Sequence, residues 1–233
     1  MNITLVAPSV SLLLLALNVG SSSTAYAQAN SQARPQPAPA SRPSRSFQVG
    51  GYAVVGKFTF KSSESFDAIL GITSAPVVGG GARVGLPFGG LFVDAGAWRL
   101  RRDGERVFVW NNTVYPLNIP VEVTMTTVAL SAGWQFHLRR VPKLLPYVAG
   151  GFTSMNYVET SDFSTPAEDV SDTFGGYHLC GGVEYRILGW LGAAAEATWT
   201  TVPDALGGGG VSKAFSEDNL GGTSVRFKIT VGR

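Results

Sequence analysis

The side chains of His178, Cys180 and Glu184 form the one group in the sequence that resembles a nucleophile site. A cysteine nucleophile is activated by an imidazole base, which a third group orients. Alternation along a strand would place all three side chains on one face. However, side chains two residues apart on a strand are separated by about 7 Å, too far for a hydrogen bond between nucleophile and base. We therefore expect no catalytic residue here and no enzyme activity.

Other chemistries leave no pattern in the sequence. No glycine-rich phosphate loop precedes a predicted helix, and no His, Cys, Asp or Glu residues have metal-ligand spacing. The single cysteine excludes a disulfide framework and a multi-cysteine zinc site. The formal net charge of +2, without a long Lys/Arg cluster, gives no indication of nucleic-acid binding. We expect no metal, no cofactor and no nucleic-acid partner.

A second set of polar residues recurs at alternate positions of extended segments, and we expect it to face the interior of a barrel. Unpaired charges away from bulk water are costly, so acids and bases in a narrow tube should pair. For Arg226 and Lys228 we expect acidic partners among Asp94, Glu184 and Glu196. The predicted lumen charge network comprises Lys57, Arg83, Asp94, His137, His178, Glu184, Arg186, Glu196, Arg226 and Lys228.

The element that shows this alternation most clearly is the last segment, Gly221–Arg233. Val225, Phe227, Ile229 and Val231 alternate with Arg226, Lys228 and Thr230, which gives a strand one apolar face and one cationic face. Lipid outside and a polar lumen inside suit such a strand. We expect it to close a barrel against Gly50–Phe60.

Period-2 stretches recur along the chain, whereas no segment after Arg45 sustains a helical repeat. The eight expected strands are Gly50–Phe60, Val78–Phe88, Leu91–Arg101, Val121–Leu138, Tyr147–Glu159, Phe174–Ile187, Trp190–Val202 and Gly221–Arg233. An even number is what an antiparallel bacterial barrel needs to close. The predicted fold class is therefore all-β: an eight-stranded antiparallel up-and-down transmembrane β-barrel.

The connections between these strands alternate in length. Short turns are expected around Gly89, Pro142–Leu145 and Leu188-Gly189. Long polar loops, which should hold Pro116 and Pro120, are expected at Lys61–Ala75, Arg102–Pro120, Thr160–Thr173 and Pro203–Gly222. Outer-membrane barrels have short periplasmic turns and long extracellular loops. Aromatic girdles near strand ends are expected from Phe58, Phe60, Phe88, Trp134, Phe136, Tyr147, Tyr185, Trp190 and Trp199.

The segment before the barrel indicates export. Residues 1–27 are predicted to be a signal peptide, because Val10–Val19 is apolar and Ala25-Tyr26-Ala27 is an A-x-A cleavage signal. Residues 28–45 are rich in Pro, Ala and Gln and are predicted to be an extended periplasmic linker. Residues 46–233 remain for the barrel. Charged residues at 15% and the 29 glycines also suit a transmembrane barrel.

Several segments carry a resemblance to a known family. GGYAVVGKFTF, SESFDAILG, TTVPDAL and GGTSVRFKITVGR resemble a group of bacterial outer-membrane β-barrels in the superfamily of the OmpA transmembrane domain. The resemblance implies an outer membrane of a Gram-negative cell envelope, with the linker in the periplasm and the long loops extracellular. It implies outer-membrane lipid and lipopolysaccharide as surroundings, and the barrel-assembly machinery and periplasmic chaperones as partners during biogenesis.

Three functions remain open at this stage. The first is an integral outer-membrane barrel with a structural or surface-interaction role and a lumen mostly filled by side chains, as an eight-stranded barrel allows. The second is a narrow porin-like channel or small-molecule transport barrel of the same membrane. The third is a soluble periplasmic ligand-binding barrel, which would need apolar residues inside and polar residues outside.

Overall fold

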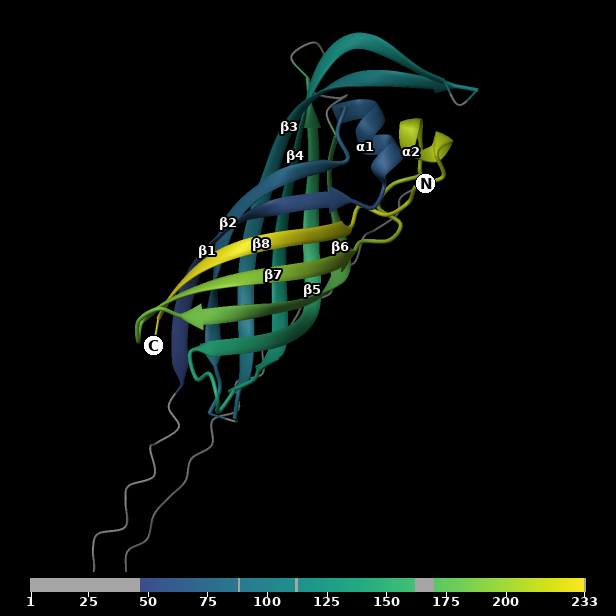
Figure 1. The fold of residues 1–233 in the computed structure, drawn as a ribbon. Coiled ribbons are helices and arrows are strands. Elements are labelled where there is room, and N and C mark those ends of the chain that lie inside the picture. The colour runs from purple at the N-terminus through teal and green to yellow at the C-terminus, as the bar shows by residue number, and fades with distance from the viewer. Residues whose placement is uncertain (1–46, 88, 112, 162–169, 233) are drawn as a thin grey trace, which may run out of the picture. The chain divides into compact units, whose positions relative to one another are not determined.

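The computed structural model of the chain contains a closed barrel of eight antiparallel strands in sequence order (Figure 1). The structure describes residues 47–87, 89–111, 113–161 and 170–232. The predicted signal peptide and linker lie outside these residues. The strands are β1 Gln48–Phe60, β2 Ser74–Gly85, β3 Leu91–Trp110, β4 Thr113–Gln135, β5 Leu144–Thr160, β6 Val170–Arg186, β7 Leu191–Thr201 and β8 Gly222–Gly232. The predicted fold class is confirmed.

The last strand closes the barrel, as its two-faced pattern predicts. β8 pairs with β7 on one side and with β1 on the other, antiparallel in both cases. Val55 of β1 lies opposite Phe227 of β8, and the two side chains are 57% and 62% exposed on the outer surface. The Gly56 and Arg226 pair next to them faces the lumen, where Arg226 is buried.

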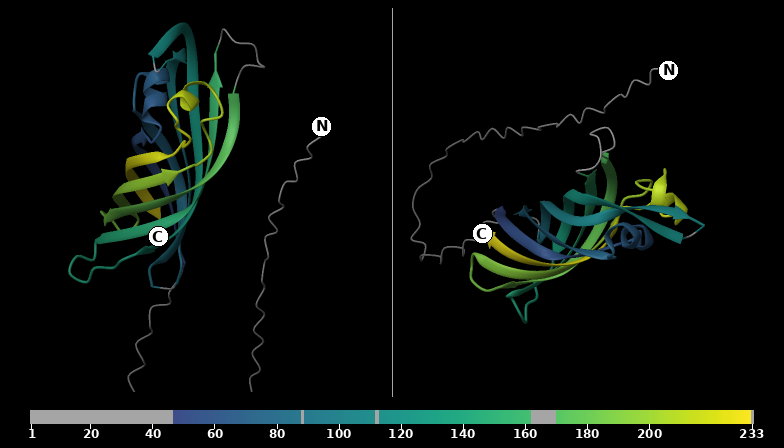
Figure 2. Two further views of the ribbon diagram at one scale, coloured as in Figure 1. Left: turned by 90° about the vertical axis from the view of Figure 1, so that its right-hand side faces the viewer. Right: turned by 90° about the horizontal axis from the view of Figure 1, so that it is seen from above.

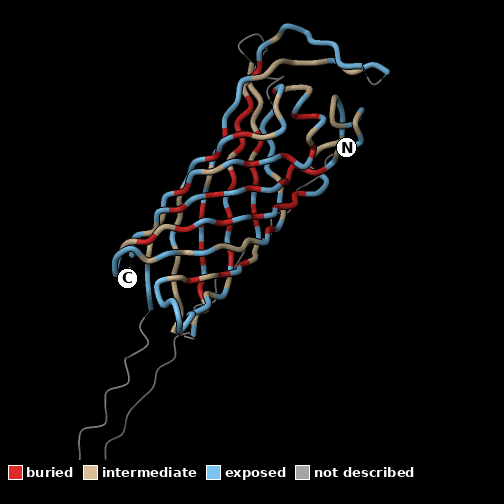
Figure 3. The backbone as a smooth tube through the Cα atoms, viewed as in Figure 1, coloured by how far each residue is buried: buried red, intermediate tan, exposed pale blue. Residues whose placement is uncertain are grey.

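Alternation of burial along the strands separates an apolar outside from a filled inside (Figure 3). The predicted facing of β3, β6, β7 and β8 is confirmed, and so is that of β4 as far as its end at Gln135. The facing of β5, which the sequence left open, puts Tyr147, Met155 and Tyr157 inside. Exposed apolar residues cover the outer surface, among them Val93, Val128, Leu130, Val148, Phe152, Leu179 and Ile229.

The facing of β1 differs from the prediction and moves Lys57 out of the lumen. Phe58 and Phe60 are both 3% exposed inside the barrel, whereas Lys57 is exposed beside Val225 on the outer surface. The two faces of this strand are both largely apolar. The bulkier aromatic face turns inward because this end of the lumen is apolar, and Lys57 must then turn outward.

The predicted aromatic girdle is correct in part. Trp134, Tyr185 and Trp199 are exposed on the outer surface, Phe136 is exposed just after β4, and Trp190 is exposed in the β6–β7 connection. Phe58, Phe60 and Tyr147 instead point into the barrel and are buried. Phe88 lies outside the described residues.

The barrel has two unlike ends (Figures 1 and 2). At the turn end lie the short β2–β3, β4–β5 and β6–β7 connections, the start of β1 and the last residues of β8. At the loop end, the β1–β2 connection forms helix α1, Ser63–Leu70, and the β7–β8 connection forms helix α2, Gly210–Ala214. α1 ends at Gly71, whose φ of 65° is the left-handed conformation that glycine adopts most easily. No helix within the described residues has the length and apolar character needed to span a membrane.

The β3–β4 connection is not the long loop that the sequence predicts. β3 and β4 continue past the barrel as a two-stranded hairpin up to Trp110 and Thr113 (Figure 1). Pro116 and Pro120 therefore lie within β4, contrary to the prediction. They are tolerated because β4 pairs with β5 only from Glu122 onward, so at Pro116 and Pro120 no described second strand requires a backbone donor. A side-chain contact lies at this edge instead, in which Ser161 donates its hydroxyl to the carbonyl of Pro120 at 2.6 Å.

The hairpin contacts α1 through a glycine. A Cβ atom at Gly104 would lie 2.5 Å from the carbonyl oxygen of Ile69 and 2.7 Å from Leu70 Cδ2. Only a residue without a side chain allows this approach between the hairpin and the last turn of α1.

Candidate functional site

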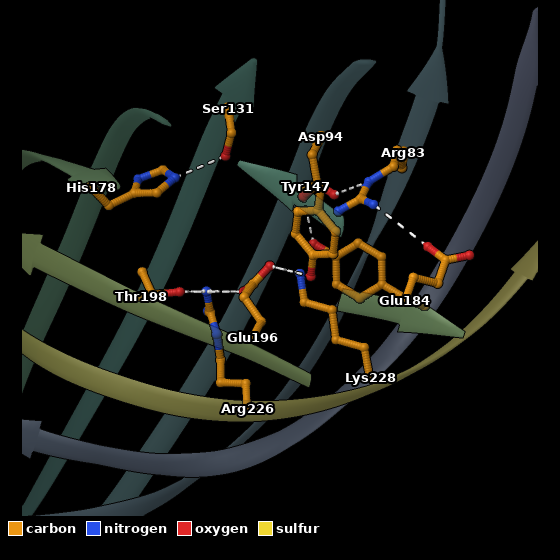
Figure 4. Close-up of polar contacts among 11 residues, drawn as sticks. Arg83, Asp94, Ser131, Tyr147, His178, Glu184, Glu196, Thr198, Arg226 and Lys228 are labelled. Atoms are coloured by element: carbon orange, nitrogen blue, oxygen red, sulfur yellow. Dashed lines mark hydrogen bonds and ion pairs between the residues drawn. The ribbon is translucent and has the colours of Figure 1, made fainter. Parts of the chain in front are cut away.

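The lumen has a charged part toward the turn end and an apolar part toward the loop end. The predicted charge network falls in the first part, where Glu196 of β7 is the most buried acid. Its Oε1 accepts from Arg226 Nη2 at 2.6 Å, and its Oε2 accepts from Lys228 Nζ at 2.7 Å (Figure 4). Tyr147 donates its hydroxyl to the same Oε2 at 2.9 Å. One buried carboxylate thus forms ion pairs with two buried cations.

The strand register explains this cluster. Glu196 and Arg226 are directly opposite on β7 and β8, and Lys228 follows two residues later on the same face. The guanidinium of Arg226 lies 4.2 Å from the ring centre of Trp98, and Lys228 Nζ lies 4.4 Å from that of Tyr52. Aromatic faces attract desolvated cations, so these two rings supplement the single carboxylate.

A second cluster surrounds Arg83 on the neighbouring strands. Its Nε donates to Asp94 Oδ2 at 3.0 Å, directly across β2 and β3. Arg83 Nη1 also lies 3.7 Å from Glu184 Oε2 on β6. Tyr52 donates its hydroxyl to the other oxygen of Asp94 at 2.7 Å. The guanidinium packs on the ring of Phe92, with a distance of 4.1 Å to the ring centre.

His178 forms a pair with Ser131 that no pattern in the sequence predicts. The hydroxyl of Ser131 on β4 lies 2.8 Å from His178 Nε2 on β6 (Figure 4). Serine and imidazole at this distance are the nucleophile and base of many hydrolases. Here both side chains are buried, and among the described residues His178 Nδ1 has no hydrogen-bond partner, so no third group orients the ring. In this position the pair can form a hydrogen bond that links β4 to β6 through side chains in the lumen.

The part of the lumen toward the loop end is filled by apolar side chains. Phe58 and Phe60 of β1, Leu100 of β3 and Phe66 and Leu70 of α1 meet there. The rings of Phe60 and Phe66 stack with centres 3.9 Å apart. The buried members of this apolar plug are Phe58, Phe60, Phe66, Leu70, Ala75, Val77, Leu100, Val123, Met125, Met155, Tyr157, Val202 and Leu220.

Polar contacts fasten the helix that covers the plug. Glu217 of the β7–β8 connection accepts backbone N–H bonds from Glu64 and Ser65 at 3.2 and 2.8 Å, which satisfies donors in the first turn of α1. Ser62 donates its hydroxyl to the carbonyl of Asn219 at 2.6 Å. The connections at opposite ends of the sequence are therefore joined over the barrel mouth.

The turn end holds a cavity of about 430 Å³ that is open to the outside. Arg83 and Glu184 lie at its inner side, and Arg186, His137 and Gln135 also line it. A void of only about 20 Å³ separates the side chains of the two charge clusters deeper in the barrel.

The ten residues predicted to form the network are thus distributed over three places. Six of them join in ion pairs: Arg83, Asp94, Glu184, Glu196, Arg226 and Lys228. His178 lies beside them, Arg186 and His137 line the cavity at the turn end, and Lys57 is on the outer surface. His137 follows the end of β4 and is exposed.

Sequence reasoning missed the aromatic and hydroxyl members of the site. Tyr52, Trp98, Ser131 and Tyr147 supply hydrogen bonds or ring faces to the charged residues. Tyr52 and Tyr147 share the buried faces of their strands, so correct facing of β1 and β5 would have found them. Within the described part of the chain, no three His, Cys, Asp or Glu residues are grouped so as to hold a metal ion.

Comparison with known proteins assigns the family. The family described as "Outer membrane protein beta-barrel domain" matches residues 13–229. The chain therefore belongs to the outer membrane protein beta-barrel domain family, whose location is the outer membrane. No curated protein matches the chain.

Solved structures include several similar folds. Neisserial surface protein A has a TM-score of 0.47 and 14% identity, with 80% of this chain and 95% of that chain covered. The N-terminal barrel domain of Pseudomonas aeruginosa OprF has a TM-score of 0.44 and 14% identity, with 79% and 97% covered. Yersinia pestis Ail, the attachment invasion locus protein, has a TM-score of 0.47 and 9% identity, with 80% and 95% covered.

Proposed function

We propose that this chain is a non-enzymatic integral outer-membrane barrel with a structural or surface-interaction role and a lumen that is closed to solutes. The observation that carries the proposal is the filling of the lumen by two successive layers. Glu196, Arg226 and Lys228 are each 5% exposed or less, and the apolar plug lies between them and the loop end. An eight-stranded barrel is just wide enough for side chains to fill it.

The outer surface supports insertion in a bilayer. Phe152 is 77% exposed and Phe227 is 62% exposed, and exposed Val, Leu and Ile residues surround them. Apolar surface on this scale is unfavourable in water and favourable against lipid tails. The same surface argues against the soluble periplasmic barrel, which would need polar residues outside.

The proposal includes an orientation in the membrane. Long loops of outer-membrane barrels are extracellular and short turns are periplasmic. The loop end, with α1, α2 and the β3–β4 hairpin, would then be extracellular, and the 28–45 linker would be periplasmic. Outer-membrane lipid and lipopolysaccharide would surround the barrel, after assembly with periplasmic chaperones and the barrel-assembly machinery.

Planar-bilayer recording tests the closed lumen. We expect no reproducible conductance from the purified, heat-modifiable barrel, and none from the Lys57→Ala variant, in which an outward side chain is shortened. Discrete conductance steps that change in the Arg226→Ala variant would overturn the proposal in favour of a porin-like channel. Spin labels at positions 227 and 228 test insertion: we expect only the label at 227 to be in contact with lipid.

A further inference from the structure

The cavity at the turn end has the size of a ligand-binding pocket. Its volume of about 430 Å³ lies within the range of ligand pockets, and Arg83 and Phe92, which also line the small void deeper in the lumen, form part of its wall. The filled lumen above makes it a blind pocket with one opening. Residues from both ends of the sequence meet in its wall, including Gln48 of β1 and Thr230 of β8.

The charges around the pocket do not balance. Deeper in the lumen, three cations and three acids are joined in ion pairs: Arg83, Arg226 and Lys228 with Asp94, Glu184 and Glu196. Arg186 adds a fourth cation. Within the described residues its guanidinium has no ion-pair or hydrogen-bond partner, although Arg186 lines the pocket and is half-buried. Its backbone N–H donates to the carbonyl of Lys143 at 2.9 Å.

Among the described residues of the wall, no acid besides Glu184 is present to neutralise Arg186. Glu184 is the one carboxylate among the described lining residues, and Arg83 already lies 3.7 Å from it. The β4–β5 turn, which leaves the rim after His137, carries three more exposed cations and no acid: Arg139, Arg140 and Lys143. Positive charge therefore exceeds negative charge among the described residues in and around the pocket, and an excess of one sign raises the local concentration of ions of opposite sign.

The rest of the wall suits a ligand that has apolar and hydrogen-bonding groups in addition to its charge. Phe92, Leu191 and Trp190 supply apolar surface, and Gln135 and Thr230 supply groups that donate and accept hydrogen bonds. Arginine binds carboxylate and phosphate oxygens through two parallel N–H bonds, so an unpaired guanidinium in such a wall is suited to an oxyanion.

We propose that this pocket binds a small organic anion, a carboxylate or phosphate that carries an apolar group, with Arg186 as its anchoring cation. The site goes beyond the structural role proposed above and does not depend on it. Bilayer recording tests whether the lumen is closed, and ligand titration tests whether the pocket binds an anion. Either result can fail while the other holds, so the failure of the two proposals is distinguishable.

Titration of the purified full-length barrel with phenyl phosphate tests the site, with the fluorescence of Trp190 and calorimetry as readouts. We expect saturable binding of phenyl phosphate, weaker binding of inorganic phosphate, which lacks the apolar group, and no binding of benzyl alcohol, which lacks the charge. A water-soluble short-chain phosphatidate, titrated in parallel, distinguishes a lipid headgroup from a free anion as the preferred source of the oxyanion.

The decisive variant is Arg186→Gln, which keeps a polar side chain of similar length. Loss of a charge-assisted hydrogen-bond pair should weaken phenyl phosphate binding about tenfold or more. The matched control is Arg102→Gln, the same substitution at an exposed position of β3 toward the loop end and outside the pocket wall, for which we expect less than about a twofold change, since exposed and distant charges are screened.

A second variant tests the pocket independently of charge. Thr230→Trp places a large ring in the wall and should abolish binding while the barrel remains heat-modifiable. No saturable binding to the native barrel would overturn the proposal. So would an unchanged affinity in the Arg186→Gln variant, or equal losses in the Arg186→Gln and Arg102→Gln variants.

Discussion

The two halves of the lumen exclude water by different physical means. Toward the turn end, ionic side chains pair with one another: Arg226 and Lys228 share Glu196, and Arg83 pairs with Asp94. Toward the loop end, packed rings and aliphatic chains around Phe60 and Leu100 do the same without a charge. The charged half depends on complete pairing, because each partner left alone keeps its full desolvation cost. The apolar half depends on volume, because each atom removed leaves a cavity.

Removal of the shared acid should have the largest effect. In the Glu196→Ala variant, Arg226 and Lys228 remain buried without an ion-pair partner, and we expect a loss of about 3–5 kcal/mol in the free energy of unfolding. Denaturant unfolding in detergent micelles measures it. Asp103→Ala, at an exposed acid of the hairpin, is the control, with an expected change within about 0.5 kcal/mol.

A triple replacement sharpens the same point. If Glu196, Arg226 and Lys228 are all changed to Leu or Met, we expect most of that loss to be recovered, because no buried charge remains unpaired. A triple variant as unstable as the Glu196→Ala variant would show that the cluster contributes more than mutual compensation.

A volume change in the apolar half should cost somewhat less. Leu100 is 5% exposed within the plug, and Leu100→Ala should lower the free energy of unfolding by about 3 kcal/mol, since buried Leu→Ala changes cost about 2–5 kcal/mol. Leu117→Ala, at a 48% exposed position of the hairpin, is the matched control and should change it little. Equal effects at both positions would contradict a packed plug.

The contact between the β7–β8 connection and α1 should matter locally. Glu217→Ala removes the acceptor for two N–H groups in the first turn of α1, a change that costs about 1 kcal/mol at helix N-termini. We expect faster hydrogen exchange in α1 and little change in the strands. Asp218→Ala, at the exposed neighbour, should leave exchange unchanged. Slow exchange in both variants would mean that packing of Phe66 alone holds α1.

The smallest effect is expected at Lys57. Because this side chain is on the outer surface, Lys57→Ala should leave the conductance unchanged. It should change the free energy of unfolding by no more than about 0.5 kcal/mol. A larger loss of stability, measured by the same denaturant titration, would indicate that Lys57 belongs to the interior network after all.

The sequence predicts the strands well where polar and apolar residues alternate. Arg226, Glu196 and His178 face the lumen as expected, because each has apolar neighbours on both sides in its strand. The same reasoning fails for β1, because both of its faces are largely apolar. Its only charged residue, Lys57, suggests an inward face that in the structure is the outer face. The assumption of a polar lumen throughout produced that error.

The helices and the hairpin also lay beyond the sequence pattern. α1 has only eight residues, and its stability comes from contact with β1 and with Glu217, which is distant in sequence. Pro116 and Pro120 favoured a loop, because proline is excluded from a strand with neighbours on both sides. No local signal shows that a strand will lack its second neighbour.

Those prolines also bear on how one barrel meets another. Beyond the barrel rim, residues 113–121 of β4 pair with β3 and with no second strand among the described residues, although Ser161 donates its hydroxyl to the carbonyl of Pro120. Such an edge presents backbone groups on which a foreign strand could add. Pro116 and Pro120 have no N–H to offer such a strand. The two prolines therefore remove two of the backbone donors that edge-to-edge pairing of the hairpin would need, whereas the rings of Phe108 and Trp110 are exposed near its tip.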